Sequence, residues 1–146
     1  MSDATPGNER TTRGGDERVA RPLDAALSVV MIEEAAVRLR NEQPYRDGDR
    51  NTVTLAKNGP LRVQLVALKR GARLHENDPE GALSVHVLEG SARVTVAGST
   101  EEVTKGSLAI LAAGQAWEVT ADEESLLLVQ LSWPPEAADS PGRDRG

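Results

Sequence analysis

The stretch GARLHENDPEGALSVHVLEG, residues 71–90, decides the fold of this chain and raises the question of its function. It contains both histidines of the chain, His75 and His86, with three carboxylates between them. After a turn-like ENDPEG segment, every second residue from Leu83 to Val87 is aliphatic, which indicates a strand with one buried face. On this pattern Leu83 faces a core and His86 faces the opposite side of the sheet.

Short β-rich runs continue along the rest of the chain. From residue 48 to residue 114, glycines recur at intervals of eight to twelve residues. They help to separate seven runs rich in aliphatic and β-branched residues, at 51–57, 61–69, 82–89, 91–97, 107–113, 116–121 and 125–133. Many short strands at this spacing are typical of an antiparallel sandwich or barrel and not of βαβ units.

The two ends of the chain have a different texture. Residues 1–22 and 136–146 are rich in small and charged residues, so both tails are predicted to be disordered. Between them, residues 23–43 form an amphipathic unit in which Val29, Ile32, Ala36 and Leu39 recur at helical steps. We expect a helix from about residue 25 to residue 41, although the β-branched SVVMI run leaves its first turns open. Residues 44–135 are predicted to form one β-barrel.

Composition excludes several classes of function. The segment 23–135 has 16 acidic and 11 basic residues, and no basic stripe is visible, so nucleic acid is not an expected partner. The absence of cysteine excludes disulfides, thiolate catalysis and cysteine-ligated metals. There is no apolar run of 18 residues and no secretory h-region, so we expect no membrane partner and a cytoplasmic location.

Two spaced motifs resemble those of the cupin superfamily, a group of small double-sheet β-barrels. The first extends from Gly71 to Gly90, and the second extends from Gly106 through Gly114 to Ala121; the family's spacing is kept in both. The resemblance covers roughly residues 51–133. It implies an all-β, cupin-type, jelly-roll-like barrel preceded by one short helix, as in small single-domain cupins in which GDRN, here residues 48–51, leads into the first strand.

The resemblance places the usual metal ligands on residues that are poor donors. The two histidines of the first motif fall on Asn77 and Pro79, its glutamate falls on Leu83, and the histidine of the second motif falls on Trp117. Metals such as Mn, Fe, Ni or Zn require imidazole or carboxylate donors. We therefore expect no metal and no other cofactor.

A rebuilt metal site is the alternative that the two histidines suggest. Catalytic zinc sites use about three protein ligands, so carboxylates would have to complete the set. The three acidic residues between the histidines are most simply a solvated loop, and the predicted strand directs His86 away from the pocket. His86 is expected to be a packed or interface residue on the outer side of the sheet, beneath the N-terminal helix.

Trp117 is the residue that makes the predicted pocket of interest. It shares a face with Gln115 and Val119, and by the resemblance that face looks into the barrel. It either fills the space of a missing metal site or serves as a stacking platform for a small apolar or planar ligand. The pocket candidates are Trp117, Leu83 and three residues able to donate hydrogen bonds, Asn77, Gln115 and His75.

Three classes of function remain open from the sequence. The expected one is a non-catalytic module that binds or senses a small molecule. The alternatives are a filled barrel that acts through oligomerisation or protein contact, and a metal-dependent enzyme of dioxygenase or isomerase type with a rebuilt site. A homodimer is expected, because many cupins dimerise and the helix adds an apolar stripe.

Overall fold

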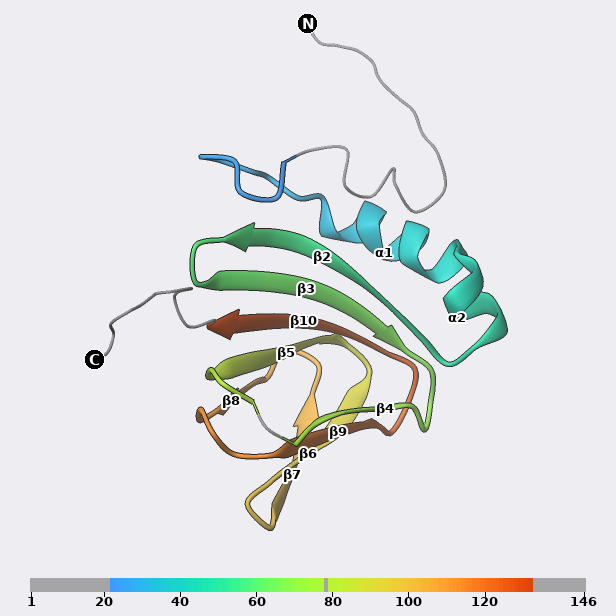
Figure 1. The fold of residues 1–146 in the computed structure, drawn as a ribbon. Coiled ribbons are helices and arrows are strands. Elements are labelled where there is room, and N and C mark those ends of the chain that lie inside the picture. The colour runs from blue at the N-terminus through green and yellow to red at the C-terminus, as the bar shows by residue number, and fades with distance from the viewer. Residues whose placement is uncertain (1–21, 78, 133–146) are drawn as a thin grey trace, which may run out of the picture.

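The computed structural model describes residues 22–77 and 79–132. Except for Pro22, the two tails predicted to be disordered lie outside these residues, as does Trp133. The described part contains two helices followed by nine strands (Figure 1). The helices are α1 (Ile32–Asn41) and α2 (Gln43–Asp47), and in the described residues no helix is both long and apolar enough to span a membrane. The strands are β2 (Arg50–Asn58), β3 (Leu61–Leu68), β4 (Arg73–Glu76), β5 (Leu83–Glu89), β6 (Ser91–Val96), β7 (Ser99–Thr104), β8 (Leu108–Leu111), β9 (Trp117–Ala121) and β10 (Ser125–Ser132).

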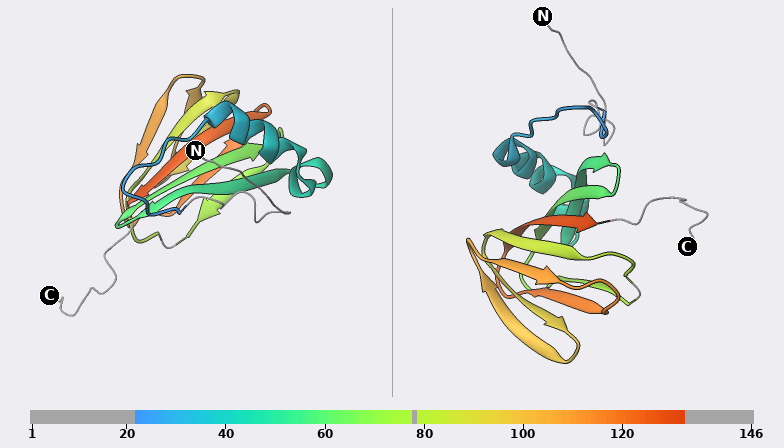
Figure 2. Two further views of the ribbon diagram at one scale, coloured as in Figure 1. Left: turned by 90° about the horizontal axis from the view of Figure 1, so that it is seen from above. Right: turned by 90° about the vertical axis from the view of Figure 1, so that its left-hand side faces the viewer.

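The strands form two antiparallel sheets that pack against each other (Figures 1 and 2). The larger sheet has the order β2-β3-β10-β5-β8, and the smaller has the order β4-β9-β6-β7. The edge strands are therefore β2 and β8 in the larger sheet and β4 and β7 in the smaller one. This is the all-β double-sheet barrel that the strand spacing predicts.

The inner core lies between the two sheets. In β5 the side chains of Leu83, Val85 and Val87 are buried there, while the intervening residues are only half-buried. On the smaller sheet Val94 of β6 and Val119 of β9 face the same core. Because strand side chains alternate between faces, each of these strands gives one set of residues to the core and the other to the outer surface.

An outer core lies on the other face of the larger sheet, where α1 and α2 cover β2, β3 and β10 (Figures 1 and 2). Leu39 of α1 is fully buried against Leu65 of β3 and its neighbours. Asn51 is also buried, and its Nδ2 donates to the backbone oxygen of Leu39 at 2.9 Å and to Oε1 of Glu42 at 2.8 Å. This amide ties the end of the helix to β2.

Tyr45 of α2 makes a second connection between the helices and the sheets. Its side chain is buried, and its hydroxyl donates to Oε2 of Glu124 in the turn before β10. Burial and this hydrogen bond raise the pKa of Tyr45 to about 12. The ammonium group of Lys69 lies 5.0 Å from the centre of the ring. The Tyr45 side chain is therefore held neutral between the two layers.

The structure differs from the sequence prediction in three places. Only one helix is predicted, but a second helix, α2, follows it and accommodates Pro44 in its first turn. Helix α1 begins at Ile32, later than the expected start near residue 25: residues 27–31, which include the β-branched Val29 and Val30, are not helical, and Met31 has an extended backbone with a ψ of 95°. Strands β4 and β7 are absent from the seven predicted runs. Both are edge strands with mostly exposed residues, so their sequences lack the apolar alternation that identifies a half-buried strand.

Gly90, the last residue of the first motif, has a conformational reason to be glycine. Its φ is +87°, and a Cβ atom there would lie 2.3 Å from the backbone oxygen of Glu124. The turn between β5 and β6 thus approaches the turn before β10 too closely for a side chain. Nearby, the buried Ser125 hydroxyl donates to the backbone oxygen of Ser91 at 3.1 Å.

Candidate functional site

A cavity of about 350 Å³ lies between the sheets. Its buried wall consists of aliphatic residues from both sheets, among them Leu83 and Val85 of β5 and Val129 of β10. Its exposed rim carries polar side chains from the edge strands, including Arg50 of β2 and Glu76 of β4. The full lining is Arg50, Thr52, Gln64, Val66, Leu74, His75, Glu76, Leu83, Val85, Trp117, Val119, Val129 and Leu131. The cavity is therefore apolar inside and polar where the two edge strands face each other.

A second cavity of about 200 Å³ adjoins the first one. The two share Glu76, Leu83, Trp117 and Leu131 in their linings. The smaller cavity is otherwise lined by the loop between β4 and β5, from Pro79 to Ala82, and by Ser132. Residues 79–82 thus close one side of the site, which is a structural role for part of the stretch between the two histidines.

Trp117 stands at the junction of the two cavities, at the start of β9. It is half-buried and packs against the inner core, so its ring faces inward with Val119, as the cupin resemblance predicts for this face of the strand. Its indole Nε1 is buried and has no hydrogen-bond partner among the described residues. A buried indole N–H normally finds an acceptor, so this donor is an unusual feature of the site.

The residues at the four expected ligand positions do not fit a metal ion. Pro79, Leu83 and Trp117 all line the 200 Å³ cavity, so the structure does bring three of these positions together. Their side chains offer no lone pair suited to a first-row metal. The fourth position, Asn77, is exposed and lies outside the linings of both cavities. In the described ranges, no group of three or more His, Cys, Asp or Glu side chains is placed to hold a metal.

The two histidines lie on different sheets. His75 of β4 is exposed, lines the rim of the 350 Å³ cavity, and pairs with Glu118 across the β4–β9 ladder. His86 of β5 is half-buried on the outer face of the larger sheet, between Leu128 of β10 and Leu108 of β8. Because its parity is opposite to that of Leu83, His86 does not face the cavity.

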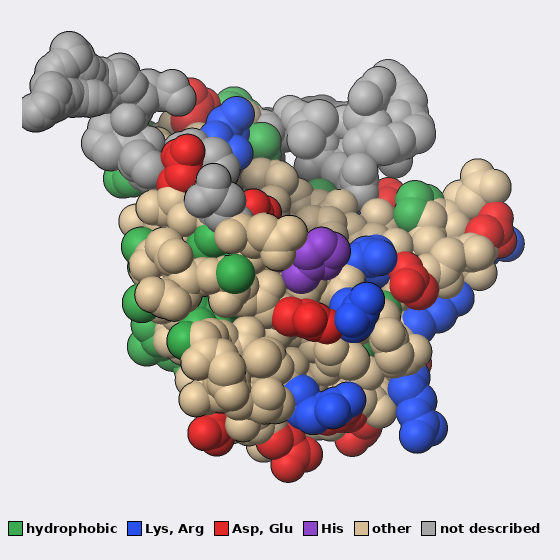
Figure 3. Space-filling model, turned by 60° about the horizontal axis from the view of Figure 1, so that its bottom comes forward, with side chains coloured by type: hydrophobic (Ala, Val, Ile, Leu, Met, Phe, Trp, Pro, Cys, Tyr) green, Lys and Arg blue, Asp and Glu red, His purple; other side chains and the backbone are tan. Residues whose placement is uncertain are grey.

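Arg50 connects the two edge strands at the rim. Its Nε donates to Oδ1 of Asp49 at 3.2 Å, and its Nη1 donates to the backbone oxygen of Arg73 on β4. Arg73 in turn pairs with Glu118 of β9 at 2.9 Å. The rim charges are thus partly compensated, and basic and acidic side chains are interspersed over the face shown in Figure 3 without forming a continuous basic patch.

The predicted pocket residues occupy two different environments. Trp117, Leu83 and His75 line the larger cavity. Asn77 and Gln115 are exposed, the first in a bend after β4 and the second in the turn before β9, and neither lines the two cavities. Sequence reasoning missed Arg50, Thr52, Gln64 and Glu76, because their place in the lining depends on which strands form the sheet edges.

Comparison with known proteins identifies the architecture. No family model and no curated protein matches the chain. Among solved structures, a conserved protein of unknown function from Streptococcus pyogenes aligns with a TM-score of 0.56 and 22% identity, over 80% of this chain and 95% of its own. A cupin superfamily protein from Desulfitobacterium hafniense aligns with a TM-score of 0.55 and 14% identity, over 57% of this chain and 77% of its own. The chain has the cupin fold.

An enzyme of known activity also aligns with this chain. A salicylate 1,2-dioxygenase from Pseudoaminobacter salicylatoxidans gives a TM-score of 0.67 at 15% identity, over 83% of this chain. The chain covers only 39% of that enzyme. At such identities the likeness concerns the cupin fold alone, and function has to be argued from the cavity itself.

Proposed function

We propose that this cupin-fold protein binds a small organic molecule in the inter-sheet cavity without a metal ion, as a non-catalytic binding or sensory module. The observation that carries the proposal is the buried Trp117 Nε1, which has no acceptor among the described residues and stands where the two cavities meet. Leaving a buried donor unpaired costs about 1–3 kcal/mol. A ligand that supplies an acceptor would recover this energy.

The lining indicates the chemical character of the ligand. Ligand sites are commonly apolar cavities of about 300–1,000 Å³ with a few placed polar groups, and the cavity of about 350 Å³ is at the small end of this range. Aliphatic residues and Trp117 form the inner wall, while Arg50, Gln64 and Glu76 stand on the polar side. We infer a small amphipathic molecule with a flat or branched apolar body and a polar group directed toward β2 and β4.

The metal-independent part of the proposal follows from donor chemistry. Pro79, Leu83 and Trp117 occupy the positions that the cupin resemblance assigns to ligands, and none of them can replace an imidazole or a carboxylate. Their apolar surfaces instead extend the apolar wall of the cavity. The site is thus better suited to contact an organic ligand than to polarise one.

Tryptophan fluorescence can test ligand binding directly. The chain has two tryptophans and one tyrosine, so the variant Trp133→Phe leaves Trp117 as the only tryptophan. We expect at least one of benzoate, benzamide and cyclohexanecarboxylate to change Trp117 emission saturably and to raise the melting temperature in proportion to the logarithm of its concentration. The absence of any response from all three probes would count against an open site.

A pair of matched variants locates the binding. Val85→Phe places a large side chain into the cavity wall and should abolish the fluorescence response. His86→Phe places the same side chain on the opposite face of β5 and should leave the response unchanged. Both variants are first compared with the parent by circular dichroism and thermal unfolding. An unchanged response in a folded Val85→Phe protein would place the ligand elsewhere.

Elemental analysis tests the metal-independent claim separately. The purified protein should contain no stoichiometric Mn, Fe, Ni or Zn, and adding these metals should not raise its melting temperature. The triple variant Pro79→His, Leu83→Glu, Trp117→His introduces three donors around one cavity and should bind Zn²⁺ or Ni²⁺ more tightly than the wild type. A stoichiometric metal in the wild-type protein would overturn this part of the proposal.

A further inference from the structure

Exposed hydrophobic side chains gather at the N-terminal end of the described chain. Seven large hydrophobic residues are exposed in the described ranges, and four of them fall within eleven consecutive positions. These four are Leu27, Val29, Met31 and Val37, with exposed fractions of 81%, 77%, 61% and 60%. We call them the N-terminal apolar patch. Single exposed aliphatic residues need no explanation, but a concentration of this kind marks an interaction surface.

The first half of the patch is an extended segment without a strand partner. The segment is held near β2 as far as residue 25, because the Leu23 backbone oxygen accepts from the N–H of Lys57 at 3.0 Å and the Ala25 oxygen accepts from Asn58 Nδ2 at 3.0 Å. Beyond that point, the backbone groups of residues 27–30 have no hydrogen-bond partner in the described part of the chain. Its apolar residues Leu27, Val29 and Met31 are each two positions apart and exposed, as is Ser28, while Val30 is half-buried.

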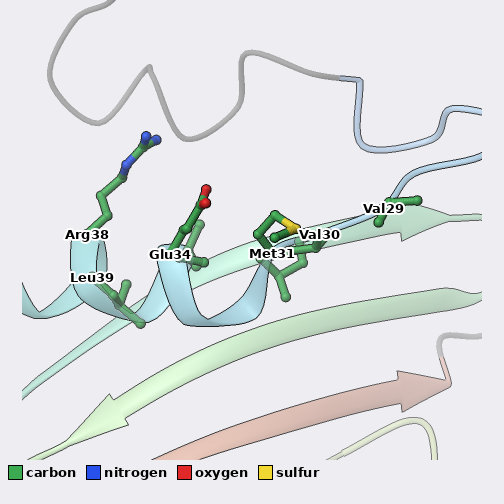
Figure 4. Close-up of a pocket in the computed structure, with 9 residues that line it drawn as sticks. Val29, Val30, Met31, Glu34, Arg38 and Leu39 are labelled. Carbon is green, nitrogen blue, oxygen red and sulfur yellow. The ribbon is translucent and has the colours of Figure 1, made fainter.

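The second half of the patch is an outer stripe on α1. Ala36 and Leu39 are buried against the larger sheet and form the inner stripe. Glu34 lies three residues after Met31, and Val37 and Arg38 lie three and four residues after Glu34. The exposed side of α1 thus carries two apolar side chains, Met31 and Val37, together with two opposite charges. In Figure 4, Glu34 and Arg38 point away from the strands, whereas Leu39 points toward them.

A groove of about 230 Å³ adjoins this stripe and shares residues with it. Val29, Met31, Glu34 and Arg38 line its outer side, and Leu39, Val53 and Leu55 line it toward the sheet (Figure 4). The extended segment, the outer stripe of α1 and the groove are therefore one continuous surface. Apolar surface of this kind, with two charges in its centre, is suited to a partner that carries complementary charges.

We propose that this surface binds the same surface of a second copy of the chain, with the two α1 helices packed antiparallel about a two-fold axis. The acidic residues Glu33 and Glu34 stand in the first turn of α1, and the basic residues Arg38 and Arg40 stand in the last. In an isologous interface each contact occurs twice, so an axis that passes between residues 34 and 38 brings Glu34 of each copy to Arg38 of the other. Within the described residues neither side chain forms an ion pair, so both are available for this contact.

The charges also distinguish this surface from the other exposed apolar region. Leu108 and Ile110 of β8 are exposed beside a groove of about 360 Å³. The lining of that groove contains Glu101 and Glu102 but no lysine or arginine. A two-fold contact there would bring like charges together, which opposes self-association. The N-terminal apolar patch is therefore the surface that fits a second copy. This inference does not depend on the proposed ligand.

Charge exchange followed by sedimentation velocity tests the contact and its register. The full-length wild type should be a dimer at micromolar concentration. Glu34→Arg and Arg38→Glu should each weaken the dimer by about tenfold or more, because each change turns both attractive contacts into repulsive ones. When the two single variants are mixed, one copy is basic at positions 34 and 38 and the other is acidic at both, so a heterodimer should form. The doubly exchanged chain should dimerise again.

Other variants of similar exposure provide the control and the contrary results. Ile110→Ser on β8 should leave the dimer unchanged, whereas Val37→Ser should weaken it. A wild-type chain that remains monomeric at tens of micromolar overturns the proposal. The N-terminal apolar patch would then be a contact site for residues 1–21 or for another protein. A wild-type dimer whose two single variants fail to form a heterodimer also overturns it, because the antiparallel contact would then be wrong.

Discussion

The two cores of this protein treat their buried polar groups differently. In the outer core, Asn51 donates to both Leu39 and Glu42, and the Tyr45 hydroxyl donates to Glu124. In the inner core, the Trp117 Nε1 has no partner among the described residues and two cavities remain beside it. The helices and the larger sheet are thus joined by two paired buried groups, although Leu39 borders a groove of about 230 Å³ and the buried Arg40 Nε has no partner among the described residues. Between the sheets, two cavities adjoin one unpaired donor.

This difference separates structural residues from functional ones. Buried polar groups that are fully paired fix one arrangement of the chain, and close packing around them leaves no room for a ligand. An unpaired donor beside a cavity departs from both rules, and such departures are expected at functional sites. If the comparison is right, substitutions in the outer core should change stability, and those around the inner cavity should change binding.

The largest expected effect comes from shortening a leucine in each core. Leu39→Ala should lower the free energy of unfolding by about 3–5 kcal/mol, because Leu39 is fully buried and borders only the groove beside α1. Leu83→Ala should cost less, about 2–3 kcal/mol, because its side chain already borders empty space. Urea unfolding monitored by circular dichroism measures both. A greater loss in Leu83→Ala than in Leu39→Ala would reverse the comparison.

Removing the buried amide should have the next largest effect. Asn51→Ala leaves the Leu39 backbone oxygen without its side-chain donor and should cost about 1–3 kcal/mol. The matched control is Asn58→Ala, which removes an exposed amide bonded to Ala25 and should cost less than about 0.5 kcal/mol. Equal losses in the two variants would show that the paired amide of the outer core has no special weight.

The tyrosine hydrogen bond predicts a dependence on pH. The pKa of Tyr45 is raised to about 12 by burial and by Glu124, above the value of about 10 for an unfolded chain. Because the folded pKa is the higher one, the stabilisation is complete below about pH 10 and is lost as the pH rises toward about 12. Tyr45→Phe should therefore be less stable than the wild type by about 1 kcal/mol at pH 9, and the difference should shrink at pH 11. Urea unfolding at both pH values provides the measurement, and a difference that grows with pH would contradict this explanation.

The fold could be predicted from the sequence where burial leaves a regular pattern. The alternation in residues 83–87 and the spacing from Gly71 to Gly90 were sufficient to place β5 and the barrel around it. Strand β7, STEEVT in sequence, has only Val103 buried, so no local pattern could identify it. The predicted start of α1 was wrong because Val29 fits the helical period but lies outside the helix, which begins only after the extended Met31.

The candidate site was less predictable, because it is built by contacts between distant strands. Strand parity placed Trp117 on one face with Val119, and the cupin resemblance directed that face inward, where the structure has it. It could not be extended to Asn77 and Gln115, which lie in a bend and a turn where the alternation stops. Arg50 and Glu76 could not be found at all from local patterns, because only the pairing of the strands makes β2 and β4 edges that face each other.

The most direct test of the central claim compares Trp117→Phe with its parent, both made in the full chain. Phenylalanine keeps a six-membered aromatic ring at this position but removes the unpaired indole N–H. The free energy of unfolding should therefore change by less than about 1 kcal/mol. Calorimetric titration with whichever of the three probes binds the parent should show affinity reduced by about five- to tenfold, the value of one hydrogen bond. Unchanged affinity together with a clear loss of stability would mean that Trp117 only fills the barrel, and would contradict the proposed function.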